Sequence, residues 1–284
     1  MTNPMLNPQH VREALRALQV RPTRGMGQNF LIDGEALRTI VETAELTPVA
    51  RVVEVGPGLG VLTWELVRRA GQVIAIELDQ RLAQRLSRLY ADTPQLTIVQ
   101  QDVLRTDIAE ITQRQPYQVV ANLPYAITSA VLRHFLECAN PPTSMVVLVQ
   151  REVAQRICGT PGDMSVLAHG IQIRAEPELV AIVPPDSFMP APEVHSAVLK
   201  LTLRPQPLID PATEARVFRV LKAGFLHARK QLGNSLAGGL AAHGIHLERS
   251  AAQAALQKAG VDPTRRAESL SLAEWVQVAD ALAL

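Results

Sequence analysis

The sequence predicts an α/β protein with a mainly parallel, doubly wound sheet of seven strands, followed by a small all-helical domain. Three observations support this prediction. Short apolar runs alternate with helical patterns along residues 51–203, and a glycine-rich turn follows the first of these runs. Beyond them the chain is rich in Ala and Leu at helical spacing, punctuated by glycines.

Seven apolar runs have the length and the β-branched composition of strands. They are Arg51–Val55, Gln72–Glu77, Leu96–Gln100, Tyr117–Ala121, Met145–Val149, Leu179–Val183 and Ala197–Leu203. Helical patterns such as Gln80–Tyr90 and Ser129–Cys138 separate the early runs, as in a parallel sheet. Only the proline-rich loop 184–192 joins the last two runs, so we expect a hairpin with one strand antiparallel to the rest.

Two prolines in Arg204–Pro207 interrupt helix and strand continuity and mark a linker. We therefore expect one domain over residues 1–204 and a helical domain over residues 205–284. A chain of 284 residues is long enough for both to bury an apolar core. We expect residues 1–30 to form a mobile segment, because Gly25 and Gly27 permit hinge-like motion over a site.

Composition and charge exclude several classes of protein. The formal net charge is only +1, so contact with nucleic acid would depend on local basic patches. Cys138 and Cys158 form no disulfide framework, and His243 and His246 have no partner at metal-ligand spacing, so no metal site is expected. No apolar run approaches the roughly 18 residues of a membrane span, and no secretory or transit signal is recognisable. We expect a cytoplasmic protein.

A glycine-rich turn predicts a site for a nucleoside. The segment Glu54–Gly60 directly follows the strand-like run Arg51–Val55. Gly56 and Gly58 let the backbone approach a ligand closely. The spacing G-x-G-x-G differs from the dinucleotide fingerprint G-x-G-x-x-G, and Pro57 stiffens the loop. This pattern favours a nucleoside such as S-adenosylmethionine over NAD.

Acidic residues follow the next two strands at the same edge of the sheet. Glu77 ends the second strand, where a carboxylate can accept hydrogen bonds from both hydroxyls of a ribose. Asp102 follows the third strand, where a carboxylate can accept from the amino group of adenine. Both positions agree with a nucleoside site.

The segment Asn122–Tyr125 describes a pocket for an aromatic amine. The side-chain carbonyl of Asn122 can accept from an exocyclic amine. Pro124 fixes φ and has no N–H, so the preceding carbonyl of Leu123 turns away from a strand ladder and faces a cavity. Tyr125 supplies a flat ring on which a base can stack. Asn and Pro are also common in plain turns, but the nucleoside site upstream favours the functional interpretation.

Together and in this order, the motifs resemble those of the ribosomal RNA adenine dimethyltransferase family, from about Arg21 to the C-terminus. The matching segments are Gly27–Leu31, Glu54–Gly60, Glu77, Asp102, Asn122–Tyr125, Gln150–Ala154, Phe188–Ser196, Arg229–Lys230, Asn234–Leu236 and Arg266–Ser271. The resemblance implies a Rossmann-like methyltransferase sheet with S-adenosylmethionine as cofactor. It also implies dimethylation of the exocyclic amine of two adjacent adenosines near the 3′ end of small-subunit (16S) rRNA. The cofactor-site residues that it implies are Asn29, Leu31, Gly56, Gly58, Glu77, Asp102 and Asn122.

The reaction that the resemblance implies is direct methyl transfer to the adenine amine. Hydrogen bonds to the Asn122 side-chain oxygen and the Leu123 carbonyl would free the nitrogen lone pair and stabilise the developing charge. Tyr125 is expected to stack on one face of the base and Phe188 on the other. Pro190 and Pro192 beside Phe188 indicate a rigid loop rather than a core strand.

A run of basic residues without acids, Arg216–Lys230, predicts a phosphate-binding surface in the helical domain, although a plain solvated helix face is the alternative. The candidate RNA-binding residues are Arg21, Arg24, Arg151, Arg219, Lys222, Arg229, Lys230, Arg265 and Arg266. The expected partner is the small ribosomal subunit or its precursor, and we expect a monomer that contacts no membrane.

Three other functions stay open. The first is the sister activity, dimethylation of large-subunit rRNA, which gives macrolide resistance. The full match across Phe188–Ser196 and Arg266–Ser271 favours the small-subunit substrate. The second is an NAD-dependent oxidoreductase that uses Gly56–Gly60 and Glu77, but no Tyr-x-x-x-Lys pair accompanies them. The third is a non-catalytic ribosome-assembly factor, against which the intact Asn122–Tyr125 segment argues.

Overall fold

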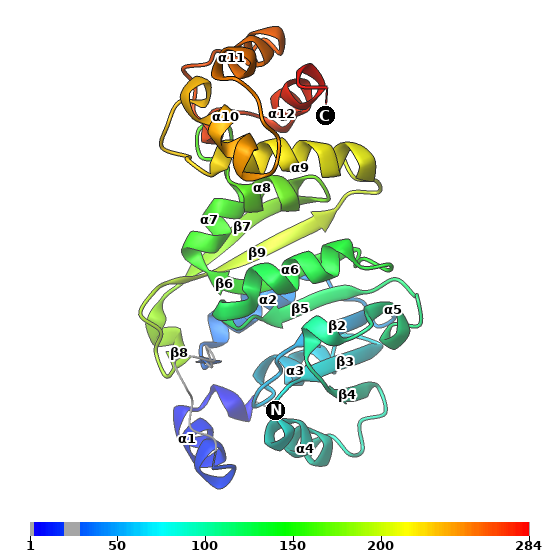
Figure 1. The fold of residues 1–284 in the computed structure, drawn as a ribbon. Coiled ribbons are helices and arrows are strands. Elements are labelled where there is room, and N and C mark those ends of the chain that lie inside the picture. Colours follow the sequence, from blue (N-terminus) through cyan, green and yellow to red (C-terminus); the bar gives the residue numbers. More distant parts are fainter. Residues whose placement is uncertain (1–2, 20–28, 284) are drawn as a thin grey trace. The chain divides into compact units, whose positions relative to one another are not determined.

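The computed structural model describes residues 3–19 and 29–283. The chain forms two compact units, one made of residues 1–154 and 176–203 and the other of residues 155–175 and 204–284 (Figure 1). The boundary between the two units after residue 203 coincides with the linker predicted at Arg204–Pro207. Residues 155–175, which the sequence analysis placed in the first domain, group with the C-terminal helices.

The first unit is built on a seven-stranded sheet with the order β4-β3-β2-β5-β6-β9-β7. The strands are β2 (Arg51–Val55), β3 (Gln72–Glu77), β4 (Leu96–Gln100), β5 (Gln118–Asn122), β6 (Ser144–Gln150), β7 (Ala175–Val183) and β9 (Ser196–Leu203). Neighbours from β4 to β6 pair in parallel, and β9 is antiparallel to β6. The prediction of a mainly parallel, seven-stranded sheet with an antiparallel strand is confirmed.

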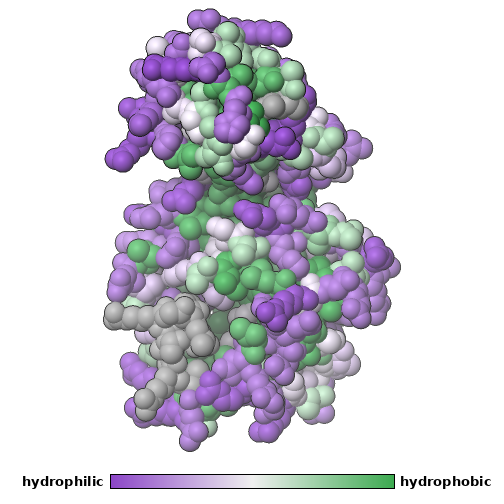
Figure 2. Space-filling model, viewed as in Figure 1, coloured by the Kyte–Doolittle hydropathy of each residue, from purple (hydrophilic) through white to green (hydrophobic). Residues whose placement is uncertain are grey.

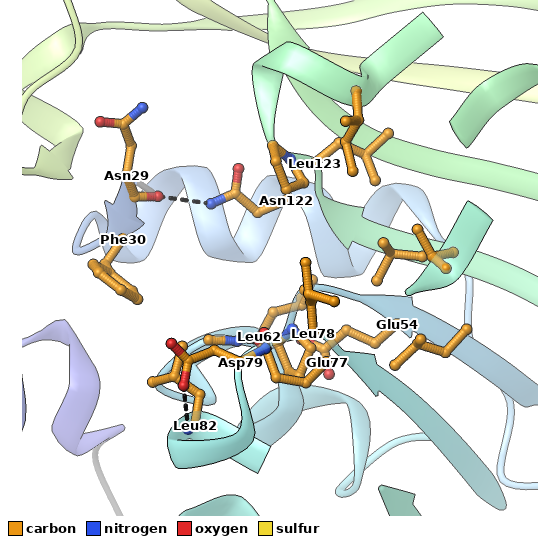
Figure 3. A pocket seen from close by; sticks show the side chains of 18 of the residues that line it. Asn29, Phe30, Glu54, Leu62, Glu77, Leu78, Asp79, Leu82, Asn122 and Leu123 are labelled. Carbon is orange, nitrogen blue, oxygen red and sulfur yellow. Dashed lines mark hydrogen bonds between the residues drawn. The ribbon is translucent and has the colours of Figure 1, made fainter. Parts of the chain in front are cut away.

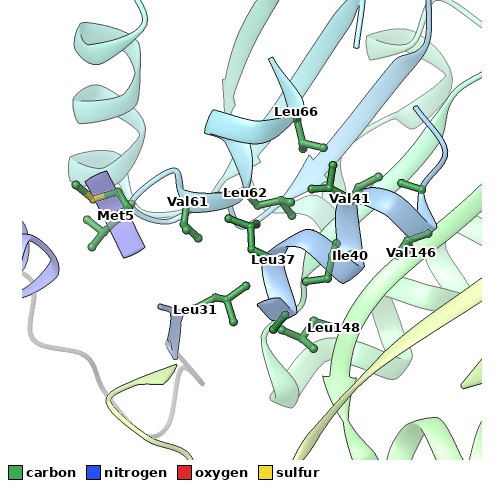
Figure 4. Close-up of a cluster of buried hydrophobic side chains, with 14 of the residues drawn as sticks. Met5, Leu31, Leu37, Ile40, Val41, Val61, Leu62, Leu66, Val146 and Leu148 are labelled. Atoms are coloured by element: carbon green, nitrogen blue, oxygen red, sulfur yellow. The ribbon is translucent and has the colours of Figure 1, made fainter. Parts of the chain in front are cut away.

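The helices of the first unit are α1 (Pro8–Ala17), α2 (Gly34–Thr43), α3 (Val61–Leu66), α4 (Gln80–Leu89), α5 (Ile108–Ile111) and α6 (Thr128–Glu137). Short 3-10 turns lie at Pro4–Leu6, Val103–Arg105, Tyr125–Ile127 and Pro185–Ser187. In β6, Val146 and Leu148 join the cluster around α2 that Figure 4 shows. The alternate side chains Met145 and Val147 are buried as well. Burial on both faces explains why β6 reads as a continuous apolar run.

Two further strands lie outside the main sheet. β1 (Phe30–Leu31) pairs antiparallel with β8 (Phe188–Met189), so that Leu31 is opposite Phe188. Phe188 is 3% exposed and belongs to the hydrophobic core. The expectation of a rigid loop at Phe188 was therefore wrong, because its backbone finds a strand partner far away in the sequence.

The N-terminal segment contributes to the same core. Met5, Val11 and Leu15 are buried in the hydrophobic cluster of the first unit. Each of these three buried side chains stabilises the packing of the N-terminal segment against the core by roughly 1.5–3 kcal/mol. The segment 1–30, predicted to be mobile, thus includes an anchored part over residues 3–19, and Gly25 and Gly27 lie outside the described residues.

The second unit is helical, as the sequence predicts. Its helices are α8 (Val166–Gln172), α9 (Pro211–Phe225), α10 (Leu232–Ala242), α11 (Arg249–Lys258) and α12 (Leu272–Ala281), and α7 (Arg151–Ile157) enters it from the first unit. Trp275 is fully buried against Gly224, where a Cβ atom would lie 2.4 Å from the indole ring. A bidentate ion pair between Arg174 and Glu214, at 2.7 and 2.8 Å, joins the segment 155–175 to α9.

Hydrophilic residues dominate the face of the molecule seen in Figure 2. Among residues 3–19 and 29–283, no helix has the length and the apolar character that crossing a membrane requires.

Candidate cofactor and substrate site

A cavity of about 530 Å³ lies at the carboxyl ends of the central strands (Figure 3). The strand order reverses between β2 and β5, and such switch points are where open α/β sheets bind ligands. The lining comes from residues 29–31, 54–58, 61–62, 76–79, 82, 101–103 and 122–127. It includes every predicted cofactor residue, namely Asn29, Leu31, Gly56, Gly58, Glu77, Asp102 and Asn122. It also includes the predicted catalytic residues Leu123, Pro124 and Tyr125, but not Phe188.

The glycine-rich turn forms one wall of the cavity. Gly58 has φ +58°, and a Cβ atom there would lie 3.0 Å from the ring of Phe30. Gly60 has φ +87°, and a Cβ atom there would lie 2.7 Å from Leu86. The positive φ at both positions favours glycine, and any larger residue would also have to displace the neighbouring side chain. The result is a wall of bare backbone that a ligand can approach closely.

Glu77 holds this turn in place. Its Oε2 accepts from the backbone N–H of Gly58 at 3.0 Å, and its Oε1 accepts from that of Asp79 at 2.9 Å. The side chain is 6% exposed, and burial raises the pKa of its carboxyl, against which the two hydrogen bonds act. Each oxygen keeps a further acceptor site, so the carboxylate can hold the turn and still receive two hydroxyls.

Asp102 is more exposed than Glu77. Its Oδ1 accepts from the backbone N–H of Leu104 at 3.0 Å and so caps the 3-10 turn that follows β4. Oδ2 lies 3.8 Å from the guanidinium of Arg105, whose side chain is exposed. Capping fixes the direction of the carboxylate at the edge of the cavity, which agrees with the predicted contact to an adenine amine.

The amide of Asn122 has a defined orientation. Its Nδ2 donates to the backbone carbonyl of Asn29 at 3.1 Å. Because a carbonyl can only accept, the nitrogen of the amide must face Asn29, and the oxygen faces away from it (Figure 3). The backbone N–H of Leu123, the next residue, donates to the carbonyl of Leu148 in β6 at 3.1 Å. Asn122 therefore lies at the end of the β5–β6 hydrogen-bond ladder. Asn122 lines the cavity, and among the described residues its Oδ1 has no hydrogen-bond partner.

Tyr125 stands beside this acceptor in a 3-10 turn, Tyr125–Ile127. Its hydroxyl forms a 2.6 Å hydrogen bond with the Oγ of Ser196, which is fully buried at the start of β9. Burial raises the pKa of the phenol, and the bond to Ser196 acts in the opposite direction. The ring is thereby tethered at its polar end, and Tyr125 is one of the residues that line the cavity.

Glu54 is a site residue that the sequence analysis did not single out. It lines the cavity, is 1% exposed, and accepts a hydrogen bond from the Thr63 hydroxyl at 2.7 Å. Burial raises the pKa of its carboxyl to about 8, and the nearby charge of Glu77 adds to this shift. The sequence did contain a sign of this role, because Glu54 is an acid within the β-branched strand Arg51–Val55 and strand interiors rarely bury an unpaired carboxylate.

The predicted RNA-binding residues fall into different surroundings. Arg219, Lys222, Arg229 and Lys230 are exposed on α9 and the turn after it. Arg265 is bound by Ser269 and Glu274, and Arg266 lies 3.8 Å from Glu268. The basic segment Arg216–Lys230 contains no acidic residue, but the fold brings one next to it: Arg216 pairs with Asp280 at 2.8 Å. Arg151 begins α7, while Arg21 and Arg24 lie outside the described residues.

No group of three or more potential metal ligands occurs in the part of the chain that the structure describes.

A mainly parallel sheet with a glycine-rich turn after β2 and acids at the ends of the next two strands defines a Rossmann-like fold, with a cavity where such folds bind nucleosides. The family can be stated as well. The family model described as ribosomal RNA adenine dimethylase matches residues 20–284, so this chain belongs to that family. The resemblance inferred from the motifs is confirmed.

Relatives of this chain carry related names. A ribosomal RNA small subunit methyltransferase A from Dehalococcoides mccartyi is 44% identical over 265 residues, which cover 93% of this chain and 89% of that protein. The protein of the same name from Streptococcus pneumoniae is 41% identical over 266 residues, covering 91% of each. The crystal structure of the 23S rRNA methyltransferase ErmE has a TM-score of 0.69 and 31% identity, covering 90% of this chain and all of that one. A dimethyladenosine transferase from Plasmodium falciparum, with a TM-score of 0.72 and 21% identity over 87% of this chain and 95% of that one, shares the fold.

The buried carboxyl of Glu54 predicts a pH-dependent stability. The folded pKa of about 8 lies above the ordinary value of 4.5, so the folded state retains a proton that the unfolded chain releases. Stability should therefore fall as the pH rises from about 4.5 to about 8. Glu54→Gln has no carboxyl to ionise, so its free energy of unfolding should not fall in this way. The difference in free energy of unfolding between Glu54→Gln and wild type, measured in urea, should grow in favour of the variant by on the order of 1–4 kcal/mol from pH 5 to pH 8.5. The exposed Glu42→Gln serves as control, and an advantage of Glu54→Gln that did not change with pH would contradict the argument.

Proposed function

We propose that this protein transfers methyl groups from S-adenosylmethionine to the exocyclic amines of two adjacent adenosines near the 3′ end of 16S rRNA. The observation that carries the proposal is the fixed amide of Asn122, whose oxygen has no partner among the described residues, in a nucleoside-sized cavity that the glycine-rich turn also lines. Membership of the dimethylase family and the 41–44% identity to small-subunit methyltransferases support the choice of substrate.

The lining of the cavity suits a nucleoside with a positive charge. Glu77 would accept from the ribose hydroxyls, and the bare backbone at Gly56 and Gly58 would pass close to the ligand. Leu78, which is 66% exposed at the cavity, offers apolar surface to the adenine ring beside Asp102. Glu54 would ionise more readily beside a cationic group. When bound, S-adenosylmethionine supplies a methyl group already activated by its sulfonium.

The chemistry left to the protein is alignment and charge placement. The amine of adenine is a poor nucleophile because its lone pair is delocalised into the ring. In the proposed mechanism its two N–H groups donate to the Asn122 Oδ1 and to the Leu123 carbonyl. These acceptors favour a pyramidal nitrogen with an available lone pair, and they stabilise the positive charge that develops on it. A methylated nitrogen that carries this charge is acidic and would release its proton to water, so the site needs no dedicated base.

Tyr125 would hold the base by stacking, with its ring set by the bond to Ser196. The matching role of Phe188 on the other face stays a prediction, and it would require the buried ring to leave the core. We therefore assign the positioning of the base to Tyr125 and that of the amine to Asn122 and Leu123.

The large-subunit substrate is the second candidate, because ErmE also aligns over 90% of this chain. Its identity of 31% is lower than the 41–44% of the small-subunit relatives. One assay separates the two candidates. The protein is incubated with labelled S-adenosylmethionine and undermethylated small subunits, large-subunit RNA or no RNA, and the RNA is analysed by mass spectrometry. Dimethyladenosine should form in the small-subunit RNA alone.

In the same assay Asn122→Ala should lose methylation by roughly 100-fold or more, which is the usual effect of removing one group that stabilises transition-state charge. Calorimetry with S-adenosylhomocysteine should show an affinity within a few-fold of wild type, because Asn122 is one of many lining residues. Gln101→Ala, which removes another amide from the lining, is the control and should methylate almost normally. A near wild-type rate for Asn122→Ala would mean that the amine is held elsewhere.

The second unit is proposed to recognise the ribosomal RNA. Arg219, Lys222, Arg229 and Lys230 present a positive surface, whereas Arg216, Arg265 and Arg266 are engaged with acids. Phosphate contacts of this kind give affinity through the release of counterions. The partner is therefore a small ribosomal subunit or its precursor, reached in the cytoplasm by a monomer.

Arg229→Glu combined with Lys230→Glu should weaken binding to small subunits and flatten the dependence of affinity on salt. Each lost phosphate contact should lower the slope of log K against log salt by about 0.7–0.9. The control is Lys258→Glu, an exposed cation at the end of α11. Affinity for S-adenosylhomocysteine should not change. Normal subunit binding at every salt concentration would move the recognition surface to the neighbourhood of Arg21, Arg24 and Arg151.

A further inference from the structure

Two side chains from distant segments hold the glycine-rich turn and the start of α3 that follows it, from positions that do not line the cavity. Arg85, on α4, donates from Nη1 to the carbonyl of Leu59 at 3.0 Å. Asn3, near the N-terminus, donates from Nδ2 to the carbonyl of Val61 at 2.8 Å. Neither Arg85 nor Asn3 belongs to the cavity lining. Any effect of these two residues on a ligand must therefore pass through the turn.

Arg85 is a half-buried cation. Burial lowers the pKa of its guanidinium, and a second nitrogen of the same group lies 3.7 Å from the sulfur of Met5. A guanidinium removed from water makes a stronger hydrogen bond to a carbonyl than a solvated one does. The bond to Leu59 is thus a firm restraint at the position next to Gly60.

Asn3 connects Val61 to the 3-10 turn at the N-terminus. Its side chain is 5% exposed, and its Oδ1 accepts from the backbone N–H of Met5 at 3.1 Å, so it caps the 3-10 turn Pro4–Leu6. Figure 4 shows Met5 next to Val61 at one end of the hydrophobic cluster. Arg85, Met5 and Asn3 thus form one continuous contact with the turn at Leu59 and Val61.

The turn has physical reasons to need such support. Three of its residues, Gly56, Gly58 and Gly60, have positive φ, and glycine loses more backbone entropy on ordering than any other residue. Glu77 restrains the turn at Gly58, on the side of the cavity. Restraints at Leu59 and Val61 would complete its ordering before a ligand arrives, and ordering in advance increases affinity because less entropy is lost on binding.

We propose that Asn3 and Arg85 are positioning residues of the cofactor site. Arg85 holds the glycine-rich turn directly at Leu59, and Asn3 ties the N-terminal segment to Val61, which directly follows the turn. The inference rests on the proposed cofactor. It makes residues 3–6 a functional part of that site although they do not touch the cavity. Loss of either contact should weaken cofactor binding without changing the chemistry at the amine.

The test compares variants by calorimetry with S-adenosylhomocysteine and by methylation kinetics on small subunits. Arg85→Met keeps the length and the apolar stem but removes the donor, and Asn3→Ala removes the second donor. Each should raise Kd and the cofactor KM by about 10-fold, the effect of one lost charge-assisted or buried hydrogen bond. The kcat at saturating cofactor should stay within about 2-fold of wild type, because the amine site is intact. Arg88→Met, an exposed arginine one turn further along α4, is the matched control and should change nothing.

Arg85→Lys separates the hydrogen bond from packing, because an ammonium on a flexible stem restores the donor and should recover part of the affinity. Unchanged Kd in both Arg85→Met and Asn3→Ala would overturn the inference, and so would a fall in kcat as large as the rise in KM. If Arg85→Met did not fold, Asn3→Ala would decide the question alone. Failure of the wild-type protein to bind S-adenosylhomocysteine would instead reject the proposed cofactor, and this inference with it.

Discussion

The hydrogen bond from Asn122 to the backbone of Asn29 is the contact on which the site depends. It joins the end of β5 to the residue before β1, two segments 93 positions apart. It also determines which atom of the amide faces the cavity, because the carbonyl of Asn29 accepts only a donor. An asparagine that rotated freely would offer a donor to the substrate amine as readily as an acceptor. A single backbone carbonyl thus sets the polarity of the pocket.

That carbonyl is itself held by a long-range strand pair. β1 is two residues long and has no stability alone, but it pairs with β8. The hydroxyl of Ser187 adds a 2.6 Å hydrogen bond to Asp33, which also caps α2. At the other end of the same loop, Ser196 bonds to Tyr125. The segment from the end of β7 to the start of β9 therefore supports both Asn29 and Tyr125, although none of its residues lines the cavity.

The sequence predicted the sheet well because its strands are β-branched runs that end in polar residues, and this pattern is local. The ends of β2, β3, β4 and β5 likewise place Gly56, Gly58, Glu77, Asp102 and Asn122 in one cavity, whereas Asn29 and Leu31 were predicted only through the family resemblance. Contacts between distant segments were beyond prediction: Phe188 reads as part of a proline-bounded loop until its partner Leu31 is known. The basic run in α9 looked free of acids, but Arg216 meets Asp280 from α12. Glu54 carried a local signal, an acid within a buried strand, although only its burial shows how far its pKa departs from normal.

The proposed mechanism depends on two atoms, the Asn122 Oδ1 and the amine of the substrate adenine. A crystal structure of the protein with S-adenosylhomocysteine and an adenosine-containing RNA tests this contact most directly. The adenine amine should lie about 2.7–3.2 Å from the Asn122 Oδ1, a normal hydrogen-bond distance, while the Asn122 Nδ2 keeps its bond to Asn29. An adenine amine bound out of reach of the Asn122 side chain, or an amide that had left Asn29 to donate toward the base, would contradict the mechanism.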